Sequence, residues 1–336
     1  MAVTIKEIAE VSGVSRGTVD RVLNNRGKVN PQTEKKVREC AERLGYKPNF
    51  AGKALAAKKK NYTVGIIISS NGNVFFDDVL CGIKDAAKVY EEYSIKVVLK
   101  TMKGYDADTQ LKLIESIEDN ISGLIIAPID EEIIINKIND LTEKGIGVIT
   151  LNTDVKNSNR FTYVGTDYYK GGQIAAGIVN IIKDVGNIGI VQGSNKIYSH
   201  NQRVLGFKDE IKKYKGLKIL DMFESEDDDI TSYEKTIKML QENKDIDIIF
   251  IVAAGVYGVC RAVIQMKRDI SIVCFDEIPT TIEMLKKGII KATISQQPKL
   301  QGQKVMDIMF EYLIKGEKPS SVYYIIENQI KIKQSY

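Results

Sequence analysis

Histidine and tryptophan are almost missing from this chain of 336 residues, which has one histidine, His200, and no tryptophan. A single histidine excludes metal sites built on several histidines and catalysis that needs two of them. The cysteines are also few and scattered: Cys40, Cys81, Cys260 and Cys274 include no C-x-x-C pair. This spacing favours neither a zinc cage nor a thioredoxin-type motif. We expect reduced thiols, no metal and no cofactor.

Long hydrophobic runs are missing too, because no apolar stretch approaches the ~18 residues that cross a bilayer. The amino terminus carries Glu7 and Glu10 where a secretory signal needs a basic segment followed by an apolar core. We therefore expect a cytoplasmic protein that does not enter a membrane. With 6 prolines and 43% hydrophobic residues, the composition excludes collagen-like and disordered chains and has room for two or three domains.

Glycine signatures of nucleotide binding and of hydrolysis are absent as well. No G-x-G-x-x-G follows a predicted strand, no G-x-x-x-x-G-K-[ST] occurs, and His200 has no G-x-S-x-G partner. We therefore expect that the chain is not an enzyme.

Charge is present but unevenly distributed. Residues 1–60 hold 14 Lys and Arg against 6 Asp and Glu, so their balance is +8, and the remaining residues carry −4 of the total of +4. A small basic module ahead of a larger, mildly acidic one suggests a head that binds a polyanion. A solvated lysine face is the alternative that charge alone leaves open.

Three short helices are predicted within residues 1–48. Thr4 and Glu7 form a capping box, Ser15 can cap a second helix after a glycine turn, and Asn30 can cap a third. Apolar residues recur at helical spacing in all three. In a helix-turn-helix the second helix enters the major groove, which here would bring Arg16 and Arg21 to the base edges. Any small helical hairpin with a glycine turn can imitate this pattern.

The segment 3–60 nevertheless resembles the headpiece of the lactose/galactose repressor family of bacterial transcription regulators. The shared motifs are T-I-K, A-x-x-x-G-V-S, T-V-x-R-V-L-N and L-G-Y-x-P-N at Leu44–Asn49. The resemblance implies that residues 49–60 form a hinge, which becomes helical on operator DNA and inserts Leu55 into the minor groove. An ordinary flexible linker is the alternative. The expected DNA contacts are Thr4, Ser15, Arg16, Gly17, Thr18, Arg21, Asn24, Asn49, Lys53 and Leu55.

Two positions depart from the family pattern in this segment. Lys53 stands where the family usually has arginine, and Asp20 stands where it most often has serine, on the helix expected to face DNA. A carboxylate near phosphates is repelled unless a cation neutralises it, and Arg16 lies one helical turn earlier. The sequence therefore does not determine which bases this helix recognises.

From Tyr62 onwards, apolar strands alternate with amphipathic helices, a rhythm typical of doubly wound parallel α/β domains. The fold class is thus α/β, with two lobes behind a three-helix headpiece. In parallel sheets, ligands bind beyond the carboxyl ends of the strands. Polar and aromatic residues that suit a sugar follow the predicted strands there: Asn73, Phe75, Phe76, Asn152, Asp154, Arg203, Asp276 and Gln296. As alternatives, Phe75 and Phe76 could be core residues and Asp276 a helix cap.

This larger part, about 62–329, resembles the periplasmic ribose/galactose-binding type of sugar receptor, which forms the effector domain of the same repressor family. The matching motifs include N-x-F-F, V-G-T-D, R-x-x-G-F, V-x-F-D and T-I-x-Q. The resemblance implies that the chain crosses between lobes near Gly165, Thr293 and Ile325. The first lobe would then hold about 61–164 and 293–324, and the second about 165–292 and 325–336.

Two differences leave the effector open. The Asn-Asp pair common in such receptors is missing around Val252 and Ala253, and Asn152-Thr153 replaces a common Asp-Arg. A sugar, a cyclitol, a sugar phosphate or a non-sugar metabolite therefore fits the pattern.

The sequence as a whole predicts a transcription regulator, most simply a repressor, that binds pseudopalindromic operator DNA as a homodimer and responds to a sugar-like effector. We expect a dimer because only six residues follow Ile330, too few for an added coiled segment. The alternatives are a solute receptor of a transport system, which needs export, and an α/β enzyme with a DNA-binding appendage, which needs a catalytic constellation.

Overall fold

The computed structural model describes residues 3–23, 27, 29–46, 60–69 and 73–336, and the contacts divide the chain into two compact units. The first unit contains residues 1–60, and the second contains nearly all of the rest. Within the described ranges, no helix is both long enough and apolar enough to cross a membrane.

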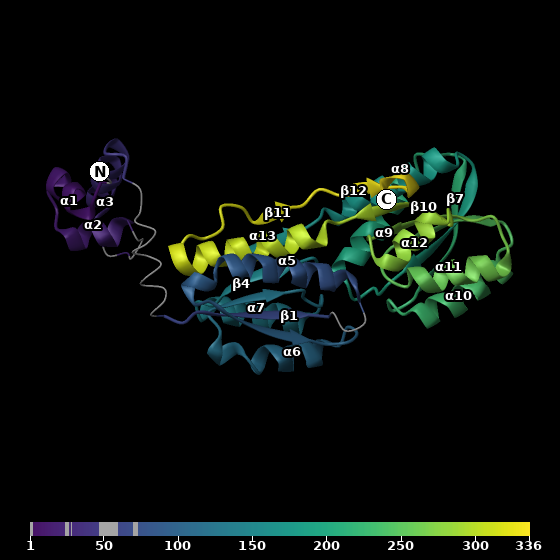
Figure 1. Cartoon of the computed structure of the whole chain (residues 1–336), viewed down its shortest axis with the longest axis horizontal. Helices are drawn as coiled ribbons and strands as arrows, with labels where there is room; N and C mark the ends of the chain where they lie inside the picture. The colour runs from purple at the N-terminus through teal and green to yellow at the C-terminus, as the bar shows by residue number, and fades with distance from the viewer. Residues whose placement is uncertain (1–2, 24–26, 28, 47–59, 70–72) are drawn as a thin grey trace. The chain divides into compact units, whose positions relative to one another are not determined.

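The first unit is a bundle of three helices: α1 (Ile5–Ser12), α2 (Arg16–Leu23) and α3 (Pro31–Arg43) (Figure 1). The predicted capping box starts α1, because the Thr4 hydroxyl accepts the Glu7 amide at 3.3 Å and the Glu7 carboxylate accepts the Thr4 amide at 2.7 Å. Gly13 ends α1 in the left-handed conformation, at φ 67°. Apolar side chains from all three helices, including Ile8, Val19 and Val37, form a common buried core.

The second unit has two lobes, each built on a six-stranded sheet. The sheet of the first lobe is parallel throughout, in the order β11 (Tyr323–Ile325), β5 (Thr162–Gly165), β4 (Gly147–Leu151), β3 (Gly123–Ile126), β1 (Thr63–Ile68) and β2 (Lys96–Thr101). The sheet of the second lobe runs β12 (Gln329–Lys331), β10 (Ile290–Ser295), β9 (Ser271–Phe275), β8 (Ile246–Ile251), β6 (Gly186–Gln192) and β7 (Leu217–Glu224). Only β12 among these described strands is antiparallel to its neighbour.

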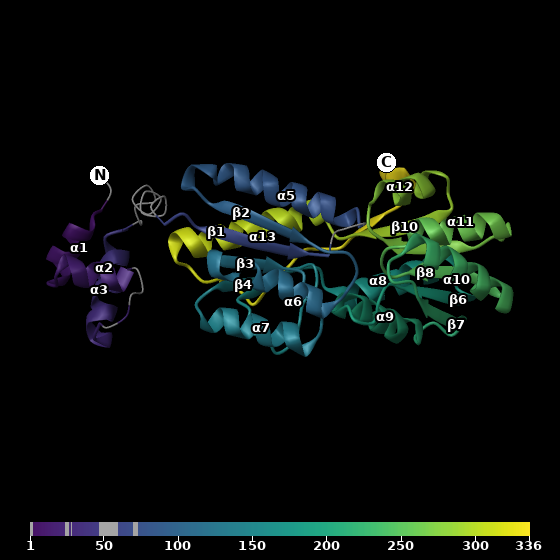
Figure 2. The same cartoon turned by 90° about the horizontal axis from the view of Figure 1, so that it is seen from below.

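Helices cover both faces of each sheet, as Figure 2 shows. In the first lobe, α5 (Phe75–Val89) and α13 (Pro298–Phe310) lie on one face, and α6 (Ala107–Glu115) and α7 (Glu132–Glu143) on the other. In the second lobe the two layers are α8 (Tyr168–Ile182) with α9 (Tyr198–Ile211), and α10 (Asp229–Glu242) with α11 (Val256–Met266) and α12 (Pro279–Lys286). Neighbours along a strand therefore enter different cores: Ile66 packs under α5 and Ile67 under α6. The predicted α/β class is confirmed.

The chain passes between the lobes three times, at loops that follow strand ends. The first passage lies between the end of β5 at Gly165 and the start of α8 at Tyr168, and the last lies between Ile325 and Gln329. The middle passage begins after Ser295, because Thr293 still pairs with Lys331 inside the second sheet. It therefore starts two residues beyond the position expected from sequence, where the apolar strand gives way to Gln296 and Gln297.

Candidate functional site

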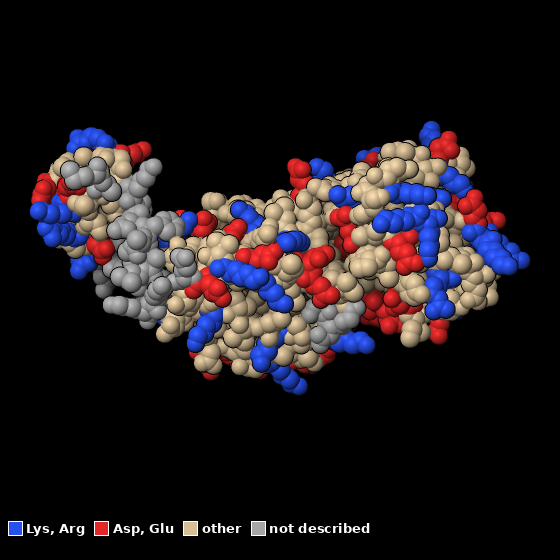
Figure 3. Space-filling model, viewed as in Figure 1, with Lys and Arg blue, Asp and Glu red and all other residues tan. Residues whose placement is uncertain are grey.

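The first unit exposes the amino-terminal residues of α2. Val19 and Val22 are buried, which leaves Arg16, Gly17 and Arg21 on the exposed side of the helix. Helical periodicity explains this division, because residues three apart share a face. Figure 3 shows Lys and Arg side chains gathered on this unit.

The other expected DNA contacts in this unit divide into two groups. The hydroxyl of Ser15 accepts the Thr18 amide at 3.1 Å and lies 2.9 Å from the Thr18 hydroxyl, so both side chains help to start α2. The Thr4 hydroxyl belongs to the capping box of α1. Asn24, Asn49, Lys53 and Leu55 lie outside the described residues.

Four of the expected ligand residues converge where strands of both lobes end; we call them the strand-end cluster: Asn152, Arg203, Asp276 and Gln296. The Asn152 amide nitrogen donates to the Gln296 side-chain oxygen at 3.4 Å, and the Gln296 amide nitrogen donates to the Asp276 carboxylate at 2.6 Å. Asn152 follows β4 of the first lobe, whereas Asp276 follows β9 of the second. The cluster therefore joins the two lobes.

Two backbone conformations in the cluster are uncommon for residues other than glycine. Asn152 has φ 62° and Asp276 has φ 73°, both in the left-handed region. Asparagine and aspartate tolerate this region better than most residues, and such positions gather at ligand sites. Each is anchored by its own amide, which donates at 2.9 Å to Val164 O or to Ile294 O.

Arg203 is the central cation of the cluster and is only 3% exposed. Its guanidinium lies 3.9 Å from the ring centre of Phe275, and one terminal nitrogen donates to the Val252 carbonyl at 2.7 Å. Its Nε has no hydrogen-bond partner among the described residues. A buried guanidinium with a free donor is prepared to bind an acceptor oxygen.

Burial raises the pKa of Asp276, while the nearby Arg203 cation and the Gln296 hydrogen bond counteract this rise. The carboxyl thus lies beside a positive charge and the Gln296 amide, which in turn accepts from the Asn152 amide. Carboxylate, guanidinium and amide groups together suit a ligand with several hydroxyl groups, because they can accept from and donate to each hydroxyl.

The remaining expected ligand residues lie elsewhere. Phe75 and Phe76 are 4% and 7% exposed and pack into the core of the first lobe, which agrees with the alternative assignment as core residues. Asn73 accepts the Phe75 amide at 3.1 Å through its side chain. Asp154 forms a bidentate ion pair with Arg160, in which both nitrogen–oxygen distances are 2.5 Å.

A second polar group near the strand ends was not expected from sequence. Tyr105 of the first lobe donates its hydroxyl to the Asp227 carboxylate of the second lobe. The Asp227 carboxylate also accepts the Ala254 amide at 3.1 Å and lies 4.0 Å from His200 Nε2. Asp227 thus supplies a carboxylate next to Val252 and Ala253, where the sequence lacks the usual Asn-Asp pair. Gly193 leaves room for Asp227, since a Cβ at this position would lie 2.3 Å from that carboxylate.

Acidification is expected to destabilise the second unit through His200, because burial lowers the pKa of this imidazole below 6.5. Its Nδ1 accepts the Ser194 amide at 3.1 Å, so the neutral form fits this position. Between the two pKa values the unfolded state binds more protons, and folding stability falls as pH drops below about 6.5, by at most about 1.4 kcal/mol per pH unit.

Thermal melting between pH 7.5 and pH 5 measures this effect. His200→Gln should flatten the dependence of Tm on pH relative to the unchanged protein, whose carboxyl groups supply the common background. An identical slope in the two proteins would contradict the assignment.

Two families of known proteins match this chain. "Bacterial regulatory proteins, lacI family" matches residues 4–49, and "Periplasmic binding protein domain" matches residues 64–318. Among characterised relatives, catabolite control protein A of Priestia megaterium is 29% identical, with 100% of this chain and 99% of that protein covered. The probable HTH-type transcriptional repressor ExuR of Bacillus subtilis is 27% identical, with 94% of each covered.

Solved structures match the second unit. GanP, a glucose-galactose binding protein from Geobacillus stearothermophilus, superimposes with a TM-score of 0.76 at 28% identity, covering 81% of this chain and 98% of GanP. Since the relatives that match along nearly the whole chain are transcription regulators, and the match includes the helix-turn-helix, the chain belongs to the lacI family of bacterial regulatory proteins, with a periplasmic-binding-protein domain behind its DNA-binding headpiece.

Proposed function

We propose that this regulator binds operator DNA through α2 and that a small molecule held at the strand-end cluster controls its affinity for DNA. One observation carries the proposal: a single chain joins a headpiece with exposed Arg16 and Arg21 to a two-lobed unit whose lobes meet at a polar cluster. The headpiece favours this function over that of a solute receptor, for which a DNA-binding module has no use.

The effector is a sugar or a sugar derivative in this proposal. Arg203, Asp276 and Gln296 offer donors and acceptors to hydroxyl groups, and the 28% identical GanP is a glucose-galactose binding protein. A neutral polyol suits the cluster because the Asp276 carboxylate already lies beside the Arg203 cation.

Control of DNA binding would work through the arrangement of the two lobes. Besides the Tyr105–Asp227 hydrogen bond, Glu131 and Lys196 approach within 3.8 Å across the lobes, and the Asp130 amide donates to the Lys196 carbonyl at 3.4 Å. A ligand that binds one arrangement more tightly shifts the population toward it by its difference in affinity.

We further propose that the regulator acts in the cytoplasm as a homodimer. Apolar side chains on one edge strand of each sheet support pairing with a second copy: Val97 and Leu99 of β2, and Leu220 and Met222 of β7, are 38–43% exposed. Such a dimer binds a DNA site whose two halves are related by the symmetry of the protein.

Arg16→Ala is expected to weaken binding to operator DNA by about tenfold or more, because a bidentate contact between arginine and guanine contributes about 1–3 kcal/mol of discrimination. The DNA is first selected from a random library with the purified full-length protein, and fluorescence anisotropy then measures the affinity. A selected site with two related halves supports the dimer.

Lys35→Ala is the matched control, because Lys35 is an exposed cation on α3 of the same unit, with a side chain 79% exposed. It should change affinity only slightly. If the unchanged protein, Arg16→Ala and Lys35→Ala bind the DNA with equal affinity, α2 does not recognise the DNA sequence through Arg16. Failure to select any DNA would overturn the proposed function.

A further inference from the structure

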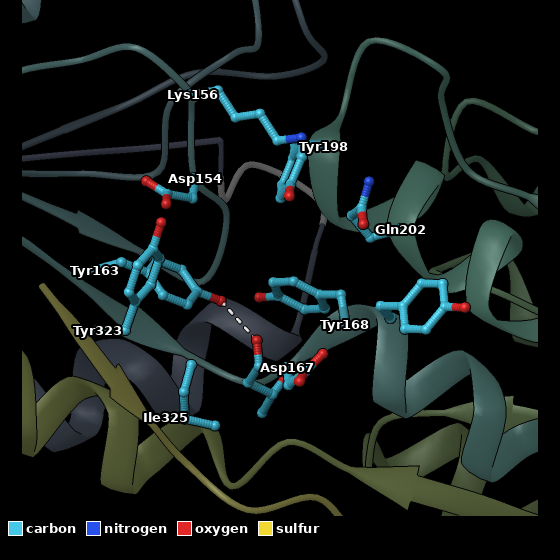
Figure 4. A pocket seen from close by; sticks show the side chains of 11 residues that line it. Asp154, Lys156, Tyr163, Asp167, Tyr168, Tyr198, Gln202, Tyr323 and Ile325 are labelled. Carbon is cyan, nitrogen blue, oxygen red and sulfur yellow. Dashed lines mark hydrogen bonds between the residues drawn. The ribbon is translucent and has the colours of Figure 1, made fainter.

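A pocket of about 430 Å³ opens between the lobes, and none of the residues Arg203, Asp276 and Gln296 lines it. Figure 4 shows tyrosine side chains from several segments facing the same space. Tyr163 comes from β5, Tyr168 from the start of α8, Tyr198 from the start of α9 and Tyr323 from β11. We call this space between the lobes the tyrosine pocket. Its volume falls within the range of ~300–1,000 Å³ that is usual for small-molecule sites.

Two buried hydroxyl groups of this pocket make no hydrogen bond of good geometry with the described residues: those of Tyr168, which is 4% exposed, and Thr166, which is 1% exposed. The Tyr168 hydroxyl lies near the side chains of Tyr163 and Thr166 without a well-aligned bond to either. The Tyr163 hydroxyl, in contrast, donates to the Thr166 carbonyl at 3.0 Å. Buried polar atoms are normally paired, so these two hydroxyls point to a polar group that enters from the pocket.

The cations near the pocket already lie against the tyrosine rings. Lys156 Nζ is 5.6 Å from the ring centre of Tyr198, the Arg160 guanidinium is 4.9 Å from that of Tyr323, and the Arg203 guanidinium is 4.9 Å from that of Tyr168. A cationic ligand would have to displace these groups from the rings.

The charged groups at the pocket balance one another. Asp154 is paired with Arg160, whereas Asp167, which caps α8 by accepting the Lys170 amide at 2.9 Å, keeps its negative charge. Lys156 also lines the pocket and carries the opposite charge, so the lining together with Arg160 has no net charge. A charged ligand would therefore lose its hydration without gaining a partner.

We propose that the tyrosine pocket is a second ligand site, beside the strand-end cluster, for an uncharged compound that has an aromatic or other flat apolar ring together with hydroxyl groups. The ring packs on the tyrosine side chains, and a hydroxyl pairs with Tyr168 and Thr166. A ligand of this class has the size of an aryl glycoside. Because both lobes and two of the three passages between them line the pocket, its occupancy also biases the arrangement of the lobes; this consequence rests on the proposed function, whereas binding itself does not.

The test uses phenyl β-D-glucopyranoside and phenyl β-D-galactopyranoside as probes, titrated into the full-length protein by calorimetry. Tyr198→Ala removes one wall of the pocket and should weaken binding more than tenfold. Tyr168→Phe removes one hydroxyl and keeps the ring, and should weaken binding by about threefold to tenfold. Tyr257→Ala, a change of an exposed tyrosine on α11, should leave binding unchanged.

Asp276→Asn separates the two sites, because Asp276 belongs to the strand-end cluster and does not line the tyrosine pocket. In this variant, the part of the binding of both phenyl glycosides that Tyr198→Ala removes should remain, whatever happens to sugar binding at the cluster. If Asp276→Asn abolishes binding while Tyr198→Ala does not, the probes bind the cluster and the second site is refuted. The absence of binding at 10 mM of either probe also overturns it, and neither result affects the proposed binding of operator DNA.

Discussion

Replacing Arg203 with alanine is expected to abolish the response of DNA binding to the effector while the affinity for operator DNA without effector stays the same. The guanidinium is buried, stacked on Phe275 and tied to Val252, so its orientation is set before any ligand arrives. Losing one partner of a buried charge-assisted hydrogen bond costs about 2–5 kcal/mol, which corresponds to a loss of ligand affinity of about thirtyfold or more.

The measurement titrates effector into a complex of full-length protein and operator DNA and follows fluorescence anisotropy. The effector is identified beforehand by thermal shift with a panel of pentoses, hexoses, cyclitols and their phosphates. A ligand at ~100 times its Kd adds about 2.7 kcal/mol of stability to the folded state, which gives a readable rise in Tm.

Two further variants make the result specific. Asp276→Asn removes a charge from the strand-end cluster with little change of shape, and should also lose the response even if the cavity left by Arg203→Ala weakens folding. Arg261→Ala changes an exposed arginine on α11 and should respond like the unchanged protein. A response of Arg203→Ala and Asp276→Asn at the same effector concentration as the unchanged protein would remove the cluster from the ligand site.

Arg160→Met is expected to lower the free energy of unfolding by about 3–5 kcal/mol, because it leaves the Asp154 carboxylate buried without its cation. The pair is shielded from water: the side chains of Arg160 and Asp154 are 5% and 11% exposed. After the substitution, the Thr150 hydroxyl, which donates to the carboxylate at 2.7 Å, is its one remaining side-chain partner among the residues that the structure describes.

Urea denaturation followed by circular dichroism measures this loss. The matched control is Lys287→Met, which breaks an ion pair with Glu283 in which both side chains are 55% exposed, and which should cost less than about 1 kcal/mol. Combining Arg160→Met with Asp154→Leu should recover part of the stability, because no unpaired charge remains. If Arg160→Met costs no more than Lys287→Met, Asp154 is free to serve a ligand, as the sequence pattern first indicated.

Asp154 illustrates why side-chain partners could not be predicted from the sequence. It follows a strand of the first lobe, as Asn152 does, and by position both are equally good candidates for a ligand site. The turn between β4 and β5 brings Arg160 back onto Asp154, and a strong ion pair then uses its oxygens. Tyr105 and Asp227 meet in the same way across 122 positions of sequence, because the two lobes face each other there.

Features that depend on neighbours along the chain were already determined by the sequence. The Thr4–Glu7 box starts α1 because its partners are three residues apart, and runs of Ile and Val such as residues 66–68 form strands buried on both faces because successive side chains point to opposite sides. The proximity of Asp276 and Gln296 could also be foreseen, because they follow the neighbouring parallel strands β9 and β10, whose carboxyl ends meet at one edge of a sheet. Asn152 joins them from the other lobe, which the strand pattern alone does not determine. Only the tertiary structure decided which carboxylates are already paired and that tyrosines far apart in sequence enclose one pocket. Such contacts depend on how the three passages bring the lobes together. The separation and orientation of the two lobes are not encoded in any local pattern of residues.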